Sequence, residues 1–159
     1  MEGLVVERAW EVDLDAVAAL EADAFTNPWT RDMLERELRQ SEVARVYVLR
    51  LPGQPVAAFC TCWVIYDELH INTIAVERSR RRRGLATALM RYVLEDAARD
   101  GAVRATLEVR RSNDAAQLLY QRLGFKVFAV RHRYYTQPEE DALILWLDRL
   151  DHSIPDPES

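Results

Sequence analysis

The sequence is poor in cysteine and has no long apolar run, and each shortage excludes a class of protein. Its 159 residues contain two cysteines, Cys60 and Cys62. In a strand these side chains point to the same face, so a disulfide between them would be strained, and no second Cys or His pair completes a zinc site. We therefore expect two buried thiols and no metal. No apolar run reaches the roughly 20 residues of a membrane helix, so no membrane association is expected.

The charge balance argues against a general nucleic-acid-binding protein. The net charge is −5, and Lys126 is the only lysine. The first residues contain two glutamates and no basic region, which argues against a secretory signal and predicts a cytoplasmic protein. The length fits one domain over residues 1–150, with residues 151–159 as a flexible acidic tail. We expect a monomer or a weak dimer.

The spacing of apolar residues predicts an α/β fold. The expected elements are a strand (4–9), two helices (13–25, 30–40), three strands (43–50, 56–66, 69–76), a helix (84–101), a strand (103–109), a helix (113–123) and two strands (125–133, 142–147). Asp13, Thr30 and either Ser112 or Asn113 are expected to cap helices. This order is typical of a mixed sheet with helices on its faces.

The strand at 103–109 has an unusual alternation. One face holds Val103, Ala105, Leu107 and Val109, and the other holds Arg104, Thr106, Glu108 and Arg110. A strand buried on both faces is apolar throughout. The second face is therefore predicted to open onto solvent or a polar cleft.

Residues 81–86, Arg-Arg-Arg-Gly-Leu-Ala, lie where a strand gives way to a helix. A helix N-terminus attracts anions, Gly84 lets a phosphate approach the backbone, and arginines suit phosphate. By itself the segment fits a solvated charged surface equally well. A P-loop is excluded because Gly-Lys-Ser/Thr is absent, and nucleic acid is disfavoured because no aromatic residue interleaves the arginines.

Arg81-x-x-Gly84-x-Ala86 resembles the Arg/Gln-x-x-Gly-x-Gly/Ala signature of the GNAT acetyltransferases, whose backbone amides hold the coenzyme A pyrophosphate. The resemblance implies a GNAT fold, a mixed and mostly antiparallel central sheet of about seven strands flanked by about four helices. It also implies acetyl-coenzyme A as co-substrate. The residues implied to bind it are Ile74, Ala75, Val76, Arg82, Arg83, Gly84, Leu85, Ala86, Thr87 and Asn113.

Other segments resemble a narrower group, the RimI-type enzymes, which acetylate the amino-terminal alanine of a small-subunit ribosomal protein (number eighteen). The similarity spans roughly residues 4–147. It rests on residues 107–116 with Leu119-Tyr120 and Leu123-Gly124-Phe125, on Asn27-Pro28-Trp29, on Tyr134-Tyr135 and on Glu140-Asp141-Ala142. The arginine-rich loop 80–83 is more basic than this pattern requires.

The chemistry implied is direct transfer of acetyl to an amine. Glu108, on the polar face of its strand, is expected to have a pKa raised by burial and to take the amine proton. The alternative interpretation is that Glu108 is an ordinary surface glutamate on a half-exposed strand. The resemblance assigns Tyr120 to protonating the departing thiolate. A backbone N–H near Ala75 or Val76 is the candidate donor to the oxyanion.

The part of the active site that binds the acceptor substrate is expected at Trp29, Glu68, Tyr134 and Tyr135. Glu68, Glu139, Glu140 and Asp141 are expected near its mouth, where they would attract a basic ribosomal-protein tail. The three histidines, His70, His132 and His152, are not expected to meet any acid or nucleophile, so a hydrolase has no support.

Three alternative functions stay open besides the leading one. They are a relaxed protein N-terminal acetyltransferase of archaeal type, a GNAT enzyme for a small amine, and a non-catalytic acyl-coenzyme A sensor. The presence of both Glu108 and Tyr120 argues against the sensor.

Overall fold

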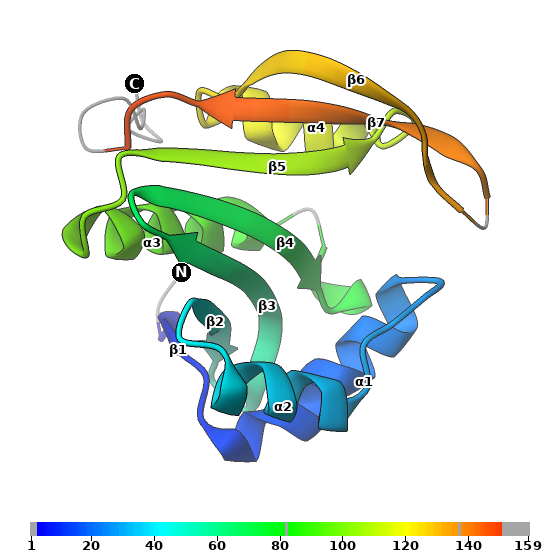
Figure 1. The fold of residues 1–159 in the computed structure, drawn as a ribbon. Coiled ribbons are helices and arrows are strands. Elements are labelled where there is room, and N and C mark those ends of the chain that lie inside the picture. The colour runs from blue at the N-terminus through cyan, green and yellow to red at the C-terminus, as the bar shows by residue number, and fades with distance from the viewer. Residues whose placement is uncertain (1–2, 82, 137, 151–159) are drawn as a thin grey trace. The chain divides into compact units, whose positions relative to one another are not determined.

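The computed structural model describes residues 3–81, 83–136 and 138–150, so the expected tail at 151–159 lies outside the described residues. The elements follow the predicted order (Figure 1). They are β1 (Val5–Arg8), the 3-10 turn η1 (Glu11–Asp13), α1 (Leu14–Ala24), α2 (Arg31–Gln40), β2 (Ala44–Leu51), β3 (Gln54–Ile65), β4 (Glu68–Val76), the 3-10 turn η2 (Arg78–Arg80), α3 (Leu85–Arg99), β5 (Arg104–Arg110), α4 (Asp114–Arg122), β6 (Lys126–Tyr135) and β7 (Glu140–Leu147).

The strands are hydrogen-bonded in the order β1-β2-β3-β4-β5-β7-β6. The β1–β2, β2–β3, β5–β7 and β6–β7 pairs are antiparallel, and β4 pairs with β5 in parallel. Within the described residues, the seven-stranded, mixed and mostly antiparallel sheet and the four α-helices confirm the predicted α/β class.

Contacts divide the chain into two compact units, which we describe separately. The first comprises Met1–Trp63 and Thr73–Val93. Its core joins α1 and α2 to β2, β3 and the end of β4, through Leu14, Val17, Leu34, Val46, Val48, Val56, Phe59 and Ala75. Burial of apolar side chains such as these is the dominant favourable contribution to folding. Both cysteines are buried and free, as expected.

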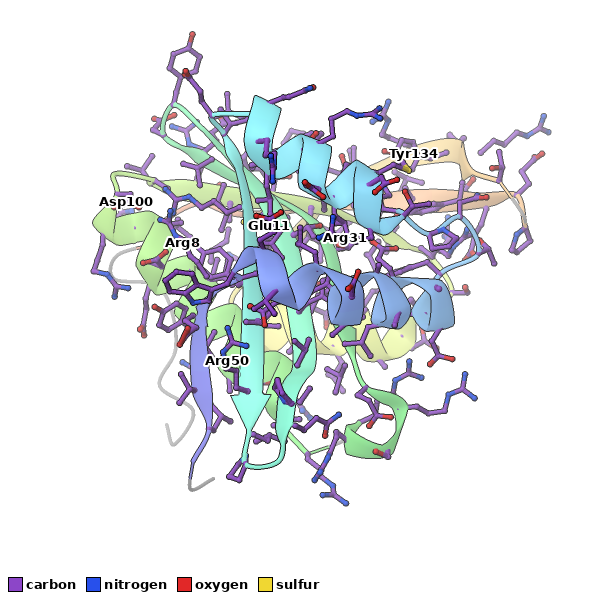
Figure 2. All side chains as sticks on the ribbon, turned by 90° about the horizontal axis from the view of Figure 1, so that it is seen from below. Arg8, Glu11, Arg31, Arg50, Asp100 and Tyr134 are labelled. Atoms are coloured by element: carbon purple, nitrogen blue, oxygen red, sulfur yellow. The ribbon has the colours of Figure 1, made fainter. Side chains whose placement is uncertain are left out.

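The two helices of the first unit begin in different ways. The Thr30 side chain accepts a hydrogen bond from the Met33 backbone N–H at 3.2 Å, which confirms the predicted cap. Asp13 precedes α1, but its side chain makes no cap bond, so that prediction is wrong. Both its carboxylate oxygens instead accept from Arg50 at 2.8 Å; Arg50, labelled in Figure 2, projects from β2.

The second unit comprises Val64–Asn72 and Leu94–Ser159. Its centre is β5, whose Ala105, Leu107 and Val109 are buried as the alternation predicts. On the opposite face Glu108 is half-buried, whereas Thr106 is buried and donates to the Leu145 carbonyl at 2.9 Å. The polar face is therefore only partly open.

Candidate active site

Gly84 forms the turn before α3, in the first unit. Its φ of +76° lies in the left-handed region, where side chains with a Cβ are strained. A Cβ built on Gly84 would meet no heavy atom within 4 Å, so the space at this turn is open. The first helical bond runs from the Ala88 N–H to the Gly84 carbonyl, and the N–H groups of the first helical turn precede it. This turn therefore has the geometry of an anion site.

Several arginines directly precede Gly84 in the sequence, and they differ in their contacts. Arg81 Nε donates to the Val76 carbonyl at 3.1 Å, and Arg80 Nε donates to Gln54 at 2.8 Å. Arg83 is exposed, and the expected ligand Arg82 lies outside the described residues. Arg81 and Arg80 thus brace the loop as well as contributing positive charge.

The other expected cofactor residues of this unit lie on β4 and α3. Ala75 and Leu85 are buried, whereas Ile74, Val76, Ala86 and Thr87 are half-buried. Residues 74–76 are consecutive at the end of β4, and residues 85–87 are consecutive at the start of α3, directly after Gly84.

In the second unit, the expected catalytic carboxylate has an unexpected partner. His70 Nε2 lies 2.9 Å from Glu108 Oε2. The cause is the parallel β4–β5 register, which sets His70 opposite Thr106, two residues before Glu108 and on the same face of β5. The expectation that His70 meets no acid is therefore wrong. The expectation for His132 is also wrong, because its Nδ1 lies 3.4 Å from Asp141 Oδ2.

The pKa of Glu108 is lowered, which corrects the expectation of a raised value. The hydrogen bond from His70 is the largest cause, and the positive charge of Arg131 acts in the same direction. Burial opposes both but does not overcome them. Glu108 is therefore an ionised carboxylate at neutral pH, held in place by a histidine that sequence reasoning missed.

Tyr120 and Asn113 belong to α4, which follows β5 directly. Asn113 caps the helix, since its side chain accepts from the Ala116 N–H at 3.1 Å, which confirms the predicted cap. Tyr120 is buried and meets Phe125 edge-to-face, with ring centroids 5.6 Å apart. Burial and the contact with Phe125 therefore fix the orientation of the Tyr120 ring.

The two expected substrate-binding tyrosines lie at the end of β6, where Figure 2 labels Tyr134. Their rings meet edge-to-face at 5.0 Å. Arg131 stacks over Tyr134 at 4.6 Å and Arg110 over Tyr135 at 4.3 Å. Burial, as the largest cause, raises the pKa of Tyr135 to about 12, so its hydroxyl stays protonated at neutral pH.

Trp29 lies between α1 and α2, and a buried acid holds it. The Trp29 backbone N–H donates to Glu21 Oε2 at 3.3 Å, and the Glu21 main-chain carbonyl accepts from the Phe25 backbone N–H at 3.0 Å. Glu21 is only 2% exposed, and burial raises its pKa. One residue thus ties both ends of the loop that carries Asn27-Pro28-Trp29.

Glu68 does not join the tyrosine pair. It lies opposite Arg104 at the start of β5, whereas Tyr135 lies opposite Glu140 beyond the other end of that strand. Its carboxylate lies 3.6 Å from an Arg104 nitrogen. Six residues of strand span about 20 Å, so Glu68 is too far away to share a pocket with the tyrosines.

The other acids expected to attract a basic tail are occupied within the chain. Glu139 pairs with Arg133 at 3.2 Å, and Glu140 pairs with Arg110 at 3.4 Å while accepting from the Ser112 N–H. Asp141 accepts from the Arg133 N–H at 3.0 Å. These contacts hold the three carboxylates within the chain itself, so a charge reversal at Glu140 would break contacts of its own unit.

Two general observations bound the chemistry. Within residues 3–81, 83–136 and 138–150, no three or more His, Cys, Asp and Glu side chains are grouped to hold a metal ion. None of the helices in this described part of the chain is long and apolar enough to cross a membrane.

Comparison with known proteins identifies the family. The model of the acetyltransferase (GNAT) family matches residues 14–125. The chain is 36% identical over 138 residues to the ribosomal protein bS18-alanine N-acetyltransferase of Salmonella typhimurium, covering 85% of this chain and 90% of that protein. It resembles the crystal structure of the ribosomal-protein-S18-alanine N-acetyltransferase from Escherichia coli with a TM-score of 0.82, 31% identity and 98% coverage of both chains.

A more distant structure shares the fold alone. Ard1 from Thermoplasma volcanium matches with a TM-score of 0.80 at 24% identity, over 91% of this chain and 97% of that one. The family match, the 36% identity and the fold agree, and the chain is a GNAT-family acetyltransferase, a family that uses acetyl-coenzyme A.

Proposed function

We propose that this acetyltransferase transfers acetyl from acetyl-coenzyme A to the N-terminal α-amine of a protein, and that its substrate is the N-terminal alanine of ribosomal protein bS18. The observation that supports this reaction is the half-buried Glu108, whose Oε2 lies 2.9 Å from His70 Nε2, a contact that lowers the pKa of the carboxyl. The similarity to bS18-alanine N-acetyltransferases over 85% of the chain supports the substrate.

The Gly84 turn supports the binding of the co-substrate. Its left-handed glycine, the open space beside it and the N–H groups of Leu85, Ala86 and Thr87 suit a pyrophosphate. Arg83 and, by its place in the sequence, Arg82 add positive charge beside this turn. We also propose that Asn113 contacts the cofactor arm besides capping α4.

The lowered pKa of Glu108 decides how it acts. An N-terminal amine has a pKa of about 8, so roughly a tenth is neutral at pH 7 and the free-energy cost of deprotonation is only about 1 kcal/mol. The neutral amine attacks the thioester carbonyl, and the attacking nitrogen becomes positively charged and acidic. An ionised carboxylate attracts that charge and accepts the proton as the C–N bond forms.

Two other groups complete the transfer. As the C–S bond breaks, the Tyr120 hydroxyl donates its hydrogen bond, and then its proton, to the departing thiolate. A backbone N–H of Ala75 or Val76 stabilises the carbonyl oxygen while it carries negative charge. Trp29, Tyr134 and Tyr135 bind the acceptor peptide through their aromatic surfaces, whereas Glu68 is no longer proposed to do so.

A panel of peptides that differ only in their first residue tests this proposal. Peptides with the bS18 N-terminal sequence starting with alanine, serine or methionine are assayed beside spermidine, with release of coenzyme A as readout. We expect at least a tenfold preference in kcat/KM, about 1.4 kcal/mol, for alanine. Comparable rates on all three peptides would favour a relaxed N-terminal acetyltransferase. Activity on spermidine alone would favour a small-amine enzyme. Binding of acetyl-coenzyme A without any turnover would favour a sensor.

A further inference from the structure

The end of β6 departs from regular strand geometry next to the tyrosine pair. Arg131 lies opposite Ala142 and Tyr135 lies opposite Glu140. Three residues, His132, Arg133 and Tyr134, therefore oppose the single residue Asp141. Extra residues on one strand of an antiparallel pair form a bulge, which redirects the side chains around it.

The centre of the bulge is Arg133, whose φ is +54°. A residue with a Cβ is strained in this left-handed region and stays there only when its surroundings hold it. The Arg133 N–H donates to Asp141 Oδ1 at 3.0 Å. The Arg133 guanidinium also pairs with Glu139 at 3.2 Å, but both of those side chains are exposed, so this pair contributes little.

Asp141 fixes the bulge to the rest of the unit. Its Oδ2 lies 3.4 Å from His132 Nδ1 and 3.5 Å from an Arg111 guanidinium nitrogen. Its main-chain carbonyl accepts from the Arg111 N–H at 3.1 Å. One residue therefore binds the bulge on one side and the loop after β5 on the other.

The bulge explains how two consecutive tyrosines touch. In a regular strand, successive side chains point to opposite faces, so neighbouring rings lie far apart. Tyr134 and Tyr135 instead meet edge-to-face at 5.0 Å, directly after the left-handed residue. We propose that the bulge at 132–134, locked by Asp141, brings these two rings together and thereby sets the affinity for the acceptor peptide, with Asp141 and the Arg133 backbone as positioning groups.

This inference rests on the proposed function, because it assigns acceptor binding to the tyrosines. A matched pair of variants isolates the backbone. Arg133→Gly keeps the N–H and adopts positive φ without strain, whereas Arg133→Pro lacks the N–H and is locked near −65°. Both variants lose the same side chain and the same ion pair with Glu139.

The measurements are KM and kcat for the alanine-starting peptide, KM for acetyl-coenzyme A, and the nuclear Overhauser contact between the two tyrosine rings. We expect Arg133→Pro to raise the peptide KM by about tenfold, the effect of losing one well-oriented aromatic contact. The kcat and the KM for acetyl-coenzyme A should stay near those of the wild type. Arg133→Gly should match the wild type throughout and keep the ring contact.

A second pair covers the case in which Arg133→Pro does not fold. Asp141→Asn retains an oxygen that accepts from the Arg133 N–H, whereas Asp141→Ala does not, so only the alanine variant should raise the peptide KM and lose the ring contact. Equal peptide KM values in the members of each pair, or a ring contact that survives in Arg133→Pro and Asp141→Ala, would overturn the inference. Absence of peptide turnover in the wild type would instead refute the proposed function, and the ring contact would still decide whether the bulge joins the tyrosines.

Discussion

His70 Nε2 and Glu108 Oε2 lie 2.9 Å apart across the parallel pairing of β4 and β5. This contact lowers the pKa of Glu108 and so keeps the carboxylate ionised where an ordinary buried glutamate would tend toward the neutral form. Arg131 and Tyr135 also interact electrostatically with Glu108, and the positive charge of Arg131 adds to the effect of His70.

Replacing His70 should therefore raise the pKa of Glu108. His70→Leu removes the hydrogen-bond donor, whereas His70→Gln keeps an N–H₂ that can donate at every pH. The Glu108 carboxyl, followed by carbon NMR as a function of pH, should titrate at higher pH in the leucine variant than in the wild type. The glutamine variant should stay close to the wild type. Identical titrations in all three proteins would show that His70 does not control the charge of Glu108.

Glu108→Gln should lower kcat/KM for the peptide by about 10²- to 10⁴-fold at neutral pH, the usual effect of losing a proton acceptor. Because the pKa of Glu108 is lowered from 4.5, the carboxylate is already ionised above that pH, and the rise in rate toward pH 8 reflects the acceptor amine. The deficit of the variant should persist above the amine pKa, because the neutral amine attacks in both proteins and only the acceptor of its proton is lost.

The matched control for this change is Glu139→Gln, which removes an exposed carboxylate of the same type from the second unit. It should retain nearly full activity. A Glu108→Gln variant as active as Glu139→Gln would count against the assigned role.

Gly84→Asp should abolish binding of coenzyme A, since it places a negative charge beside the pyrophosphate. Gly84→Asn is the control, because asparagine has the same size and tolerates the left-handed conformation that the φ of +76° requires. Calorimetry should show a modest loss of affinity for the asparagine variant and no measurable binding for the aspartate variant. Equal affinities would remove the Gly84 turn from the cofactor site.

What could be predicted from the sequence depended on how far apart the interacting residues lie along the chain. The caps at Thr30 and Asn113 were predictable because each bond joins residues three apart. Asp13 also had the residue type of a cap, but Arg50, 37 positions away, takes its carboxylate.

The candidate site shows the same division. The Gly84 turn has a short local signature, and Glu108 stood out because its strand alternates. The partner of Glu108 did not, because His70 is 38 positions away and only the β4–β5 register brings the two together. The β6 bulge carried no glycine or asparagine at its left-handed position, so Arg133 gave no turn signal.

Glu21 offers a test of the loop that carries Trp29. Burial raises the pKa of Glu21 from its ordinary 4.5, so the folded state holds that proton more tightly than the unfolded state does. The resulting stabilisation is present below the ordinary pKa and is lost as the pH rises through the raised value. At neutral pH the buried charge therefore reduces the free energy of unfolding.

Glu21→Gln should remove that penalty while keeping an oxygen that accepts from the Trp29 N–H. We expect the melting temperature of the variant to exceed that of the wild type at pH 7 and the difference to vanish at low pH, with an unchanged KM for the acceptor peptide. Asp23→Asn, an exposed change of equal net charge on the same helix, controls for general charge effects and should show no such pH dependence. A glutamine variant less stable than the wild type at pH 7 would mean that the ionised carboxylate is needed to hold the loop, because its hydrogen bond to the Trp29 N–H would then outweigh the cost of burying its charge.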